Sequence, residues 1–283
     1  MEPSYLTAFS EADIQNTQPA MKVGLLATVS PEGLPHVTLL SSLMACGPQQ
    51  ICFGQFTEGM SKQHLLANPK TAFLIMSLDK NLWRGKATYS HAVKSGAEYE
   101  YYNNVPMFRY NAYFGIHTVY YFDLVSHTGK TPLPMNKIIL GAIQTMLART
   151  MGAKPEKQAV INDWTRLFLN KIDNLKFLSY VGEDGFPVII PAIQAQSLDQ
   201  EHVLFSTSVY STEIGAIPAG IPMAIFGMAL TMEDVLLRGK YLGIRRMGGV
   251  KTGVVAVDWV YNPMPPVPGQ VYPPVELQAV TQF

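Results

Sequence analysis

The stretch Ala27–Leu39 reads ATVSPEGLPHVTL, and Ser179–Pro191 reads SYVGEDGFPVIIP at a constant offset of 152 residues. Gly33 of the first stretch falls on Gly185 of the second. Each stretch joins two β-rich runs through a short loop with Gly at a position that requires a positive φ. We therefore predict a β-hairpin in each half of the chain and a duplicated fold.

The repeat continues beyond the hairpin. Phe53 falls on Phe205 at the same offset, and the apolar pattern of the neighbouring runs matches. The further paired segments, first copy before second, are ICFGQF at 51–56 with VLFSTS at 203–208, KTAFLIMSL at 70–78 with PMAIFGMAL at 222–230, Arg84-Gly85-Lys86 with Arg238-Gly239-Lys240 after a two-residue insertion, and Asp123 with Asp258. The repeat predicts the same set of strands in each copy, with a short helix before Asn68-Pro69 in the first.

Two helical patterns, at 135–152 and 156–173, separate the copies. Apolar residues of the second pattern recur near the 3.6-residue period, which predicts one buried helix face. These residues are Val160, Ile161, Trp164, Leu167, Phe168 and Ile172. We interpret both helices as a structural connector, and the sequence then divides into residues 1–133, a connector at 134–173 and residues 174–283 with a Pro-rich tail.

The composition is that of a folded protein without a strong overall charge. Of the 283 residues, 48% are hydrophobic and 15% are charged, against a usual charged share of roughly 25%. This apolar content suffices for sizeable cores and excludes a disordered chain. Lys and Arg together number 21, as do Asp and Glu, so no net field attracts nucleic acid or an anionic membrane. A small-molecule substrate or a redox partner fits this surface better.

The cysteines and the apolar runs bear on the compartment. Cys46 and Cys52 are too few for a disulfide framework and wrongly spaced for structural zinc, so we expect a reducing cytoplasm. The acidic start MEPSYLTAFSEADIQ does not resemble a signal peptide. Residues Ile214–Met232 carry no charge, but Pro218 and Pro222 argue against a membrane helix, and the repeat predicts a loop, a helix remnant and a buried strand there.

The first copy contains an aromatic excursion that the second copy lacks. The segment between Arg84 and Asp123 is 19 residues longer than its counterpart between Arg238 and Asp258. Its aromatic residues are Tyr99, Tyr101, Tyr102, Phe108, Tyr110, Tyr113 and Phe114. Two interpretations stay open: the excursion packs on its own barrel or on the connector, or it covers a flat ligand by stacking.

Familiar catalytic motifs are missing from the sequence. Gly129-Lys130-Thr131 resembles the end of a phosphate-binding loop, but Leu124 stands where that loop requires Gly. No GxSxG, GxGxxG or HExxH motif occurs, and the six histidines do not have metal-ligand spacing, so we treat each as a surface or packing residue. No metal site is predicted.

The order of the short elements PEGLPH, ICFGQF, TEGMSKQHLLANPKTAFLI and WRGKATY does carry information. It resembles the FMN-binding split-barrel superfamily, the pyridoxamine 5′-phosphate oxidase-like proteins. The resemblance covers about Val23–Ser90 and, through the repeat, Lys176–Tyr261. It implies a mainly β fold with some α structure, in which two tandem split β-barrels are joined by the helical connector. It also implies FMN as the cofactor and a homodimer.

By this resemblance, the strand-to-helix turn of the first copy holds the FMN phosphate. Hydroxyls, backbone N–H groups at a helix start and one cation suit that dianion. The matching residues are Thr57, Gly59, Met60, Ser61 and Lys62. Ser61 stands where the family often places its Lys, with Lys62 one residue later. The structural alternative is an ordinary surface helix with Ser61 as its N-cap.

The resemblance places the flavin ring against two strands. The matching residues are Thr38, Leu39, Leu40 and Ser41 on one strand and Phe53, Gly54 and Gln55 on the next. A Gly on such a strand permits close approach of a planar ligand, although plain barrel interior is the alternative for each residue. Arg84 and Lys86 are weaker candidates, because their recurrence in the second copy equally suits a structural role such as pairing with a carboxylate.

The second copy lacks the proposed phosphate chemistry. At the offset of 152, Ser61-Lys62 becomes Glu213-Ile214, which replaces a hydroxyl and a cation by a carboxylate and an alkyl group. A carboxylate beside a phosphate is repulsive and costly to desolvate. We therefore expect one flavin per chain, with the second barrel either completing the site or serving as a scaffold while two chains pair.

The resulting hypothesis is an FMN-dependent oxidoreductase of pyridoxamine 5′-phosphate oxidase-like type, whose substrate and catalytic residues the sequence does not specify. Oxidation of pyridoxamine phosphate itself is not expected, because His36 and Ser41 replace the Arg and Lys that flank the corresponding strand in that enzyme. The alternatives are a non-enzymatic FMN protein for electron transfer or redox sensing, and the same fold binding deazaflavin F420 or haem.

Overall fold

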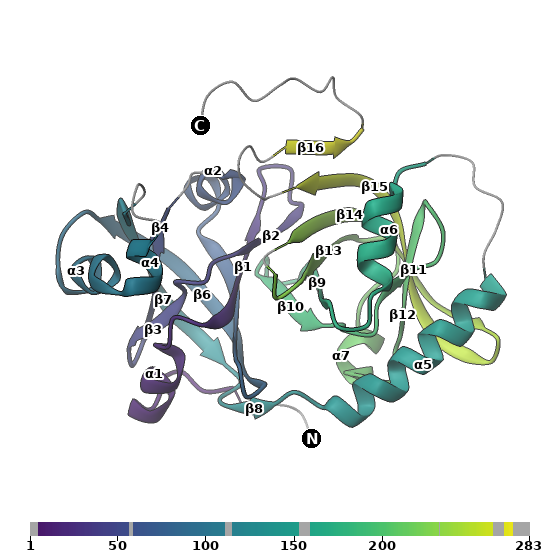
Figure 1. Cartoon of the computed structure of the whole chain (residues 1–283), viewed down its shortest axis with the longest axis horizontal. Helices are drawn as coiled ribbons and strands as arrows, with labels where there is room; N and C mark the ends of the chain where they lie inside the picture. The colour runs from purple at the N-terminus through teal and green to yellow at the C-terminus, as the bar shows by residue number, and fades with distance from the viewer. Residues whose placement is uncertain are drawn as a thin grey trace. The chain divides into compact units, whose positions relative to one another are not determined.

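The computed structural model describes residues 5–56, 59–110, 115–152, 159–231, 233–262 and 269–273. The chain separates into two compact units (Figure 1). Unit 1 comprises Met1–Leu133 with Val181–Ile189, and unit 2 comprises Pro134–Tyr180 with Ile190–Phe283. The predicted class, mainly β with some α structure in two tandem barrel-like parts, is confirmed, since each half contains its own antiparallel sheet.

The first sheet runs in the order β2-β1-β5-β6-β7-β4-β3, with β8 paired to β6 (Figure 1). Its path is open rather than closed into a complete barrel, and all its paired strands are antiparallel. The elements are α1 (Glu11–Thr17), β1 (Lys22–Val29), β2 (Pro35–Leu39), β3 (Met44–Gly47), β4 (Gln50–Gln55), α2 (Met60–Ala67), β5 (Lys70–Ser77), β6 (Asn81–Val93), α3 (Ala97–Asn104), α4 (Pro106–Tyr110), β7 (Thr118–His127) and β8 (Thr131–Pro132).

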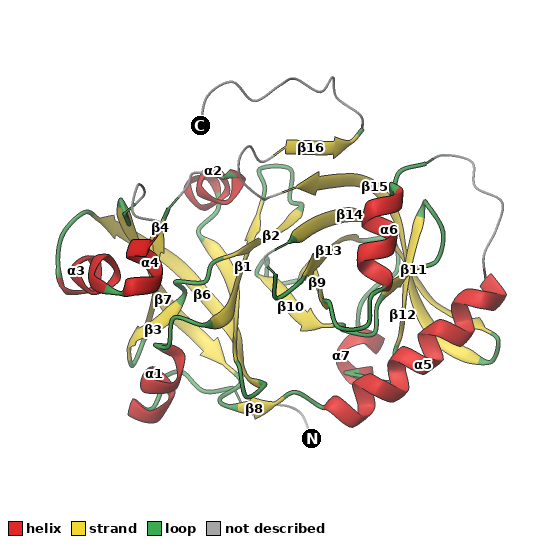
Figure 2. Cartoon of the chain, in the orientation of Figure 1, coloured by secondary structure: helices red, strands yellow, loops and turns green. Residues whose placement is uncertain are grey.

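The second sheet repeats this path as β10-β9-β13-β14-β15-β12-β11, with β16 paired to β15 (Figure 2). The elements of this half are α5 (Met135–Gly152), α6 (Asp163–Asn170), β9 (Leu175–Val181), β10 (Pro187–Pro191), β11 (Gln196–Ser197), β12 (His202–Ser206), α7 (Ser211–Gly215), β13 (Pro222–Met228), β14 (Asp234–Met247), β15 (Val250–Asn262) and β16 (Gly269–Tyr272). The identical strand order confirms the internal repeat.

The hairpins that contain Gly33 and Gly185 are built alike. Gly33 has φ 77° and Gly185 has φ 76°, a region that favours glycine. The N–H of Gly33 donates to the Ser30 carbonyl and that of Gly185 to the Gly182 carbonyl, each at 2.9 Å. The conserved position of Gly in the repeat therefore follows from turn geometry.

The two Arg-Gly-Lys triplets do not occupy equivalent positions in the two sheets. Relative to the strand that precedes each of them, their pairing differs by two residues. Arg84 lies opposite Leu74, whereas Arg238 lies opposite Ala224, the counterpart of Ala72. What the triplets share is a close approach at the glycine. A Cβ on Gly85 would lie 2.1 Å from the Ser126 carbonyl oxygen, and one on Gly239 would lie 1.9 Å from that of Ala256. Both glycines lie beside irregularities of the ladder, where only Gly fits.

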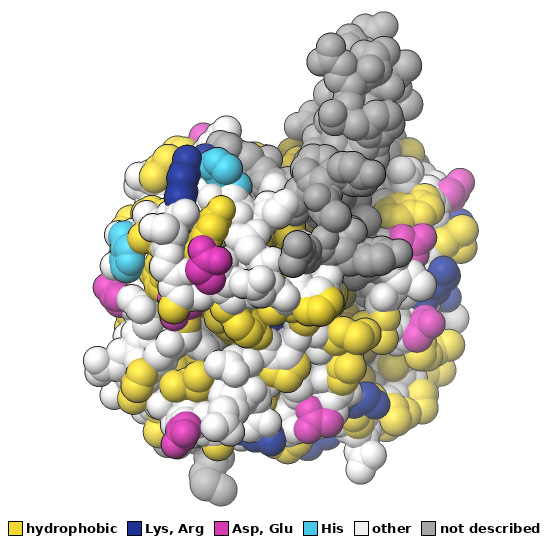
Figure 3. All heavy atoms as spheres, turned by 60° about the vertical axis from the view of Figure 1, so that its left-hand side comes forward, with side chains coloured by type: hydrophobic (Ala, Val, Ile, Leu, Met, Phe, Trp, Pro, Cys, Tyr) yellow, Lys and Arg dark blue, Asp and Glu magenta, His cyan; other side chains and the backbone are white. Residues whose placement is uncertain are grey.

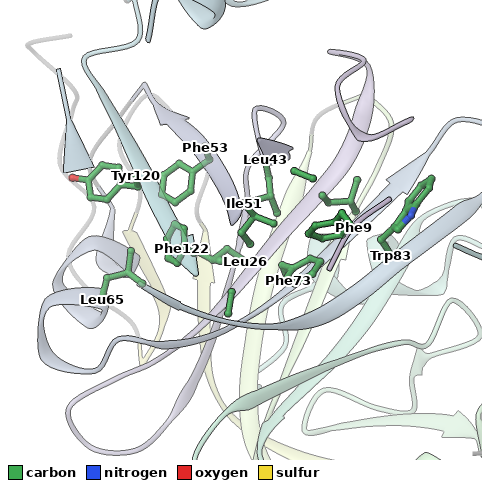
Figure 4. Packing of buried hydrophobic residues seen from close by; sticks show 13 residues of the cluster. Phe9, Leu26, Leu43, Ile51, Phe53, Leu65, Phe73, Trp83, Tyr120 and Phe122 are labelled. Carbon is green, nitrogen blue, oxygen red and sulfur yellow. The ribbon is translucent and has the colours of Figure 1, made fainter. Parts of the chain in front are cut away.

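The core of the first sheet is a cluster of aromatic and aliphatic side chains contributed by most of its strands (Figure 4). Trp83 is fully buried, and its indole Nε1 donates to Oδ1 of Asp13 at 2.7 Å. Asp13 also closes a capping box with Ser10 at the start of α1. One polar side chain thus both starts α1 and fixes that helix to the barrel core.

The connector departs from the predicted pattern in its second helix. Asn162 caps α6 by accepting a hydrogen bond from the Thr165 amide at 2.8 Å, so the helix begins at Asp163. The predicted buried face is therefore wrong in part, because Trp164, Leu167 and Ile172 are 48%, 58% and 59% exposed. The helix instead buries the face formed by Thr165, Phe168 and Leu169. Val160 and Ile161 are buried in the non-helical segment before α6, where both of their N–H groups donate to the Gln200 carbonyl.

The aromatic excursion of the first copy forms α3 and α4 and packs on its own barrel. Tyr102 is fully buried, and its hydroxyl donates to the Ser42 carbonyl at 2.7 Å. Phe108 joins the same cluster, beside Cys52 and Ile116. Tyr102 and Phe108 therefore follow the first of the two interpretations, in which the excursion packs on its own barrel. Tyr113, Phe114 and the side chain of Tyr110 lie outside the described residues.

The uncharged run in the second copy is the predicted helix remnant, α7, followed by the buried strand β13. Among the described helices, none has the length and apolar character to span a bilayer. On the face shown in Figure 3, basic and acidic side chains are interspersed with hydrophobic ones and form no continuous field of one sign, as the charge balance predicts.

Candidate functional site

The start of α2 is the first part of the predicted site. Its N-cap is Gly59, in extended backbone at φ −120° and ψ −175°. Ser61 is therefore the second residue of the helix and not its cap, so the alternative with Ser61 as N-cap is wrong. Helix geometry leaves the N–H groups of Met60 and Ser61 without intrahelical acceptors, and Gly59 has no side chain to cap them. The N–H of Lys62 donates to the Gly59 carbonyl at 3.3 Å. Such a helix start suits an anion.

A hydroxyl pair lies beside this helix start. Oγ1 of Thr38, at the end of β2, is hydrogen-bonded to Oγ of Ser61. Ser61 is 9% exposed and Thr38 is half-buried. Each hydroxyl has one O–H donor, and one of the two is used within the pair. The other donor can therefore serve a ligand, and the structure joins a predicted phosphate residue to a predicted ring residue.

Two buried histidines on the same elements as this pair were not predicted as site residues. His64 follows Ser61 by three residues on α2, and its Nδ1 lies 3.1 Å from Oγ1 of Thr28 on β1. Its ring meets that of His36 on β2 edge to face, with centroids 5.1 Å apart. Both side chains are under 4% exposed, so they anchor α2 on β1 and β2. The available signal was periodicity, since His64 shares a helix face with Ser61 and His36 a strand face with Thr38.

The two predicted ring segments are linked through Ser42. Its Oγ donates to the Gly54 carbonyl at 2.8 Å and lies 3.2 Å from the Gly54 amide nitrogen, which donates to it. This connection brings the end of β4 next to the chain that follows β2. The residues of these segments that keep part of their surface exposed are Thr38, Leu39, Leu40, Ser41 and Gln55, each of which is half-buried.

Phe53 and Gly54 face protein rather than open space. Phe53 is 5% exposed and stacks on Tyr120, with ring centroids 5.1 Å apart and planes within 8°. A Cβ on Gly54 would lie 2.7 Å from Cδ1 of Ile116. The absence of a side chain at Gly54 therefore makes room for Ile116. Phe53 and Gly54 thus lie in the barrel interior, which was the structural alternative to contact with the flavin ring.

Arg84 and Lys86 make contacts within unit 1. Nη1 of Arg84 donates to the Ile189 carbonyl at 3.1 Å, and Lys86 forms an ion pair with Asp184. Burial opposes ionisation of Asp184, but hydrogen bonds from Lys86 and from the Phe186 amide hold its pKa below the ordinary value. Carboxylate pairing, the structural alternative for Lys86, is thus present.

The remaining predicted phosphate residues are only partly placed. Met60 and Lys62 are half-buried on the first turn of α2, and Gly59 is exposed. Thr57 lies outside the described residues. Among the described residues, no group of three or more His, Cys, Asp or Glu side chains could hold a metal ion.

The corresponding helix of the second copy differs in kind. α7 has five residues, Ser211–Gly215, and its N-cap Tyr210 has the left-handed φ of 52°. Ile214, the counterpart of Lys62, is fully buried, and Glu213 is half-buried. This helix start presents an acidic side chain and a core residue where α2 presents a hydroxyl and an amine.

Three solved structures to which this chain is similar each match less than half of it. An FMN-binding protein from Syntrophomonas wolfei has 15% identity and a TM-score of 0.36, covering 43% of this chain and 88% of its own. HupZ of Group A Streptococcus has 15% identity and a TM-score of 0.33, covering 41% and 89%. An F420 reductase has 20% identity and a TM-score of 0.33, covering 42% and 98%. No family model and no curated protein matches the chain.

Proposed function

We propose that unit 1 binds FMN and that the protein is an FMN-dependent oxidoreductase of pyridoxamine 5′-phosphate oxidase-like type. The observation that carries this proposal is the Thr38–Ser61 hydroxyl pair at the glycine-capped start of α2. A phosphate needs hydroxyl and N–H donors and a cation. The hydroxyl pair, the first amides of α2 and the side chain of Lys62 supply these groups.

The flavin ring would lie against the segments 38–41 and 53–55. The half-buried surface of residues 38–41 and Gln55 supports this assignment, as does the connection of the two segments through Ser42. When bound, FMN supplies transfer of hydride or single electrons. The chain would bind the phosphate, orient the ring through backbone and short side chains, and exclude water from one ring face.

One flavin per chain is the expected stoichiometry. The carboxylate of Glu213 and the buried Ile214 oppose a phosphate at the start of α7. We also expect a homodimer in the cytoplasm that acts on a small-molecule substrate or a redox partner. Light scattering of the purified protein tests the dimer.

The absorption spectrum of the purified protein tests the cofactor. We expect FMN bound at one equivalent per polypeptide, either as purified or after addition. Two equivalents would overturn the single site, and an F420 or haem spectrum would replace FMN by the alternative ligand. Turnover of NAD(P)H with an added acceptor would then separate an enzyme from a non-enzymatic flavoprotein.

A pair of matched variants tests the site. Ser61→Glu with Lys62→Ile gives α2 the residues of α7, and we expect loss of FMN binding. Glu213→Ser in unit 2 is the control and should leave the stoichiometry at one. Retention of FMN by the first variant, with a normal thermal transition, would contradict the assignment to α2.

A further inference from the structure

Unit 2 contains a small cavity of about 200 Å³ that plays no part in the proposed flavin site. Its lining residues are Trp164 of α6, Glu233 before β14, Asp234 at the start of β14 and Asn262 at the end of β15. β14 and β15 pair antiparallel, with Leu236 opposite Tyr261, so the first residues of β14 adjoin the last residues of β15. Two acidic residues, an asparagine and a tryptophan thus lie around one cavity.

Asp234 is the unusual member of this set. Its side chain is 4% exposed, and its Oδ1 has no hydrogen-bond partner among the residues that the structure describes. Burying a carboxylate without a partner costs several kcal/mol, so natural proteins rarely leave one in this state. Burial raises the pKa of Asp234 to about 7. A ligand that brings a positive charge and an N–H donor would remove both penalties.

Trp164 adds an aromatic surface to the cavity. The sequence pattern predicts that this side chain is buried, yet it is 48% exposed. Its ring stacks on Phe168, with centroids 4.9 Å apart and planes within 20°, which covers one face of the indole. The exposure leaves the other face open to a ligand. The face of an indole attracts cations more strongly than any other aromatic side chain does.

We infer that unit 2 carries a binding site for a small primary ammonium ion, in which Asp234 accepts an N–H hydrogen bond and Trp164 contacts the cation through its open face. Glu233 adds negative charge, although its Oε2 also accepts a hydrogen bond from Thr231 at 3.1 Å. The unsatisfied acceptor on Asp234 favours an ion with N–H groups over a quaternary ammonium. The absence of three metal-ligating side chains among the described residues argues against a metal ion.

Titration with butylammonium chloride, followed by calorimetry at pH 8, tests this site. We expect saturable binding, and weaker binding of tetramethylammonium, which has no N–H donor. Asp234→Asn should weaken butylammonium binding about tenfold or more, because a charged hydrogen bond is lost. Trp164→Leu should weaken it about threefold or more through the lost cation–π contact. The matched control Asp163→Asn removes an exposed carboxylate of the same helix and should leave the affinity unchanged.

Three results would overturn the proposal. They are no saturation by butylammonium in the natural protein, equal affinity in the Asp234→Asn variant, and displacement of butylammonium by equimolar calcium. Thermal unfolding of each variant confirms that it is folded. FMN content is measured on the same samples, and it should not change in Asp234→Asn, so this test is independent of the flavin proposal.

Discussion

Thr38 at the end of β2 and Ser61 on the first turn of α2 are hydrogen-bonded, hydroxyl to hydroxyl. The two residues are 23 positions apart in the sequence. Their bond ties the start of α2 to the strand against which we place the flavin ring. A single hydroxyl pair therefore connects the proposed phosphate and ring subsites.

Removing the Thr38 hydroxyl should weaken FMN binding with little loss of stability. In Thr38→Val, Ser61 loses its partner and one donor of the pair disappears, so we expect FMN affinity to fall about tenfold, the value of a typical hydrogen bond. Fluorescence titration with FMN measures this change. Thr131→Val, which removes a half-buried hydroxyl on β8, is the control and should bind FMN normally. Equal affinity of the two variants would exclude Thr38 from the site.

Substituting Gly54 should destabilise unit 1 through Ile116. The Cβ of Gly54→Ala would lie 2.7 Å from Cδ1 of Ile116, and such overpacking costs about 1–3 kcal/mol. Ile116→Ala removes the contacting atoms, so the double variant should lose less stability than the sum of the single variants. Urea denaturation measures all three. Gly47→Ala is the control, because its nearest neighbour would be 3.8 Å away.

Lys86 should be dispensable for the cofactor. Its ion pair with Asp184 has side chains 30% and 50% exposed, and such pairs contribute about 0–1 kcal/mol. We therefore expect Lys86→Met and Asp184→Asn to retain one FMN per chain and to unfold within about 1 kcal/mol of the natural protein. Loss of FMN in Lys86→Met alone would show that Lys86 contacts the cofactor after all.

The sequence was sufficient to predict features that depend on local geometry. Gly33 and Gly185 mark the same turn because each requires a positive φ, and this local requirement revealed the duplication. The identical Arg-Gly-Lys triplets that begin at Arg84 and Arg238 were misleading, because they do not pair with equivalent residues of the preceding strand. What they share is a glycine beside an irregularity of the strand ladder. That register depends on tertiary packing, which a linear alignment does not contain.

Two further differences have the same origin. The helical period at Trp164 predicts burial, but the Asn162 cap begins α6 late and turns the indole outward. Periodicity places His36 and His64 each on a face of its own element, but their contact joins a strand to a helix 28 residues away and depends on how these two elements pack. Features set by one turn were predictable, whereas features set by the meeting of distant elements were not.

The thiol of Cys46 should react slowly in the folded protein. Contact with the Cys52 thiol, together with burial, raises the pKa of Cys46, so little of the reactive thiolate forms near pH 8. We expect slow labelling by a disulfide-exchange reagent in the native protein and rapid labelling of two thiols after unfolding. Cys52→Ser should accelerate the reaction of Cys46. Equal rates before and after this substitution would contradict the role of Cys52.

The stability of the protein should fall as the pH rises through the titration of Asp234. Its folded-state pKa is raised to about 7 from an ordinary 3.8, so the folded state holds a proton that the unfolded chain releases between these values. The stability contributed by Asp234 is fully present below about pH 4 and is lost as the pH rises through 7.

Asp234→Asn cannot ionise. Relative to the natural protein it should therefore be more stable at pH 8, by at most about 4 kcal/mol, and nearly equal at pH 4. Urea denaturation at both pH values measures the difference, with Asp163→Asn as the exposed control. Added butylammonium should narrow the gap at pH 8, because the ion binds the folded natural protein more tightly than it binds the folded variant. A gap that is the same at pH 4 and pH 8 would show that the carboxylate of Asp234 does not titrate in this range.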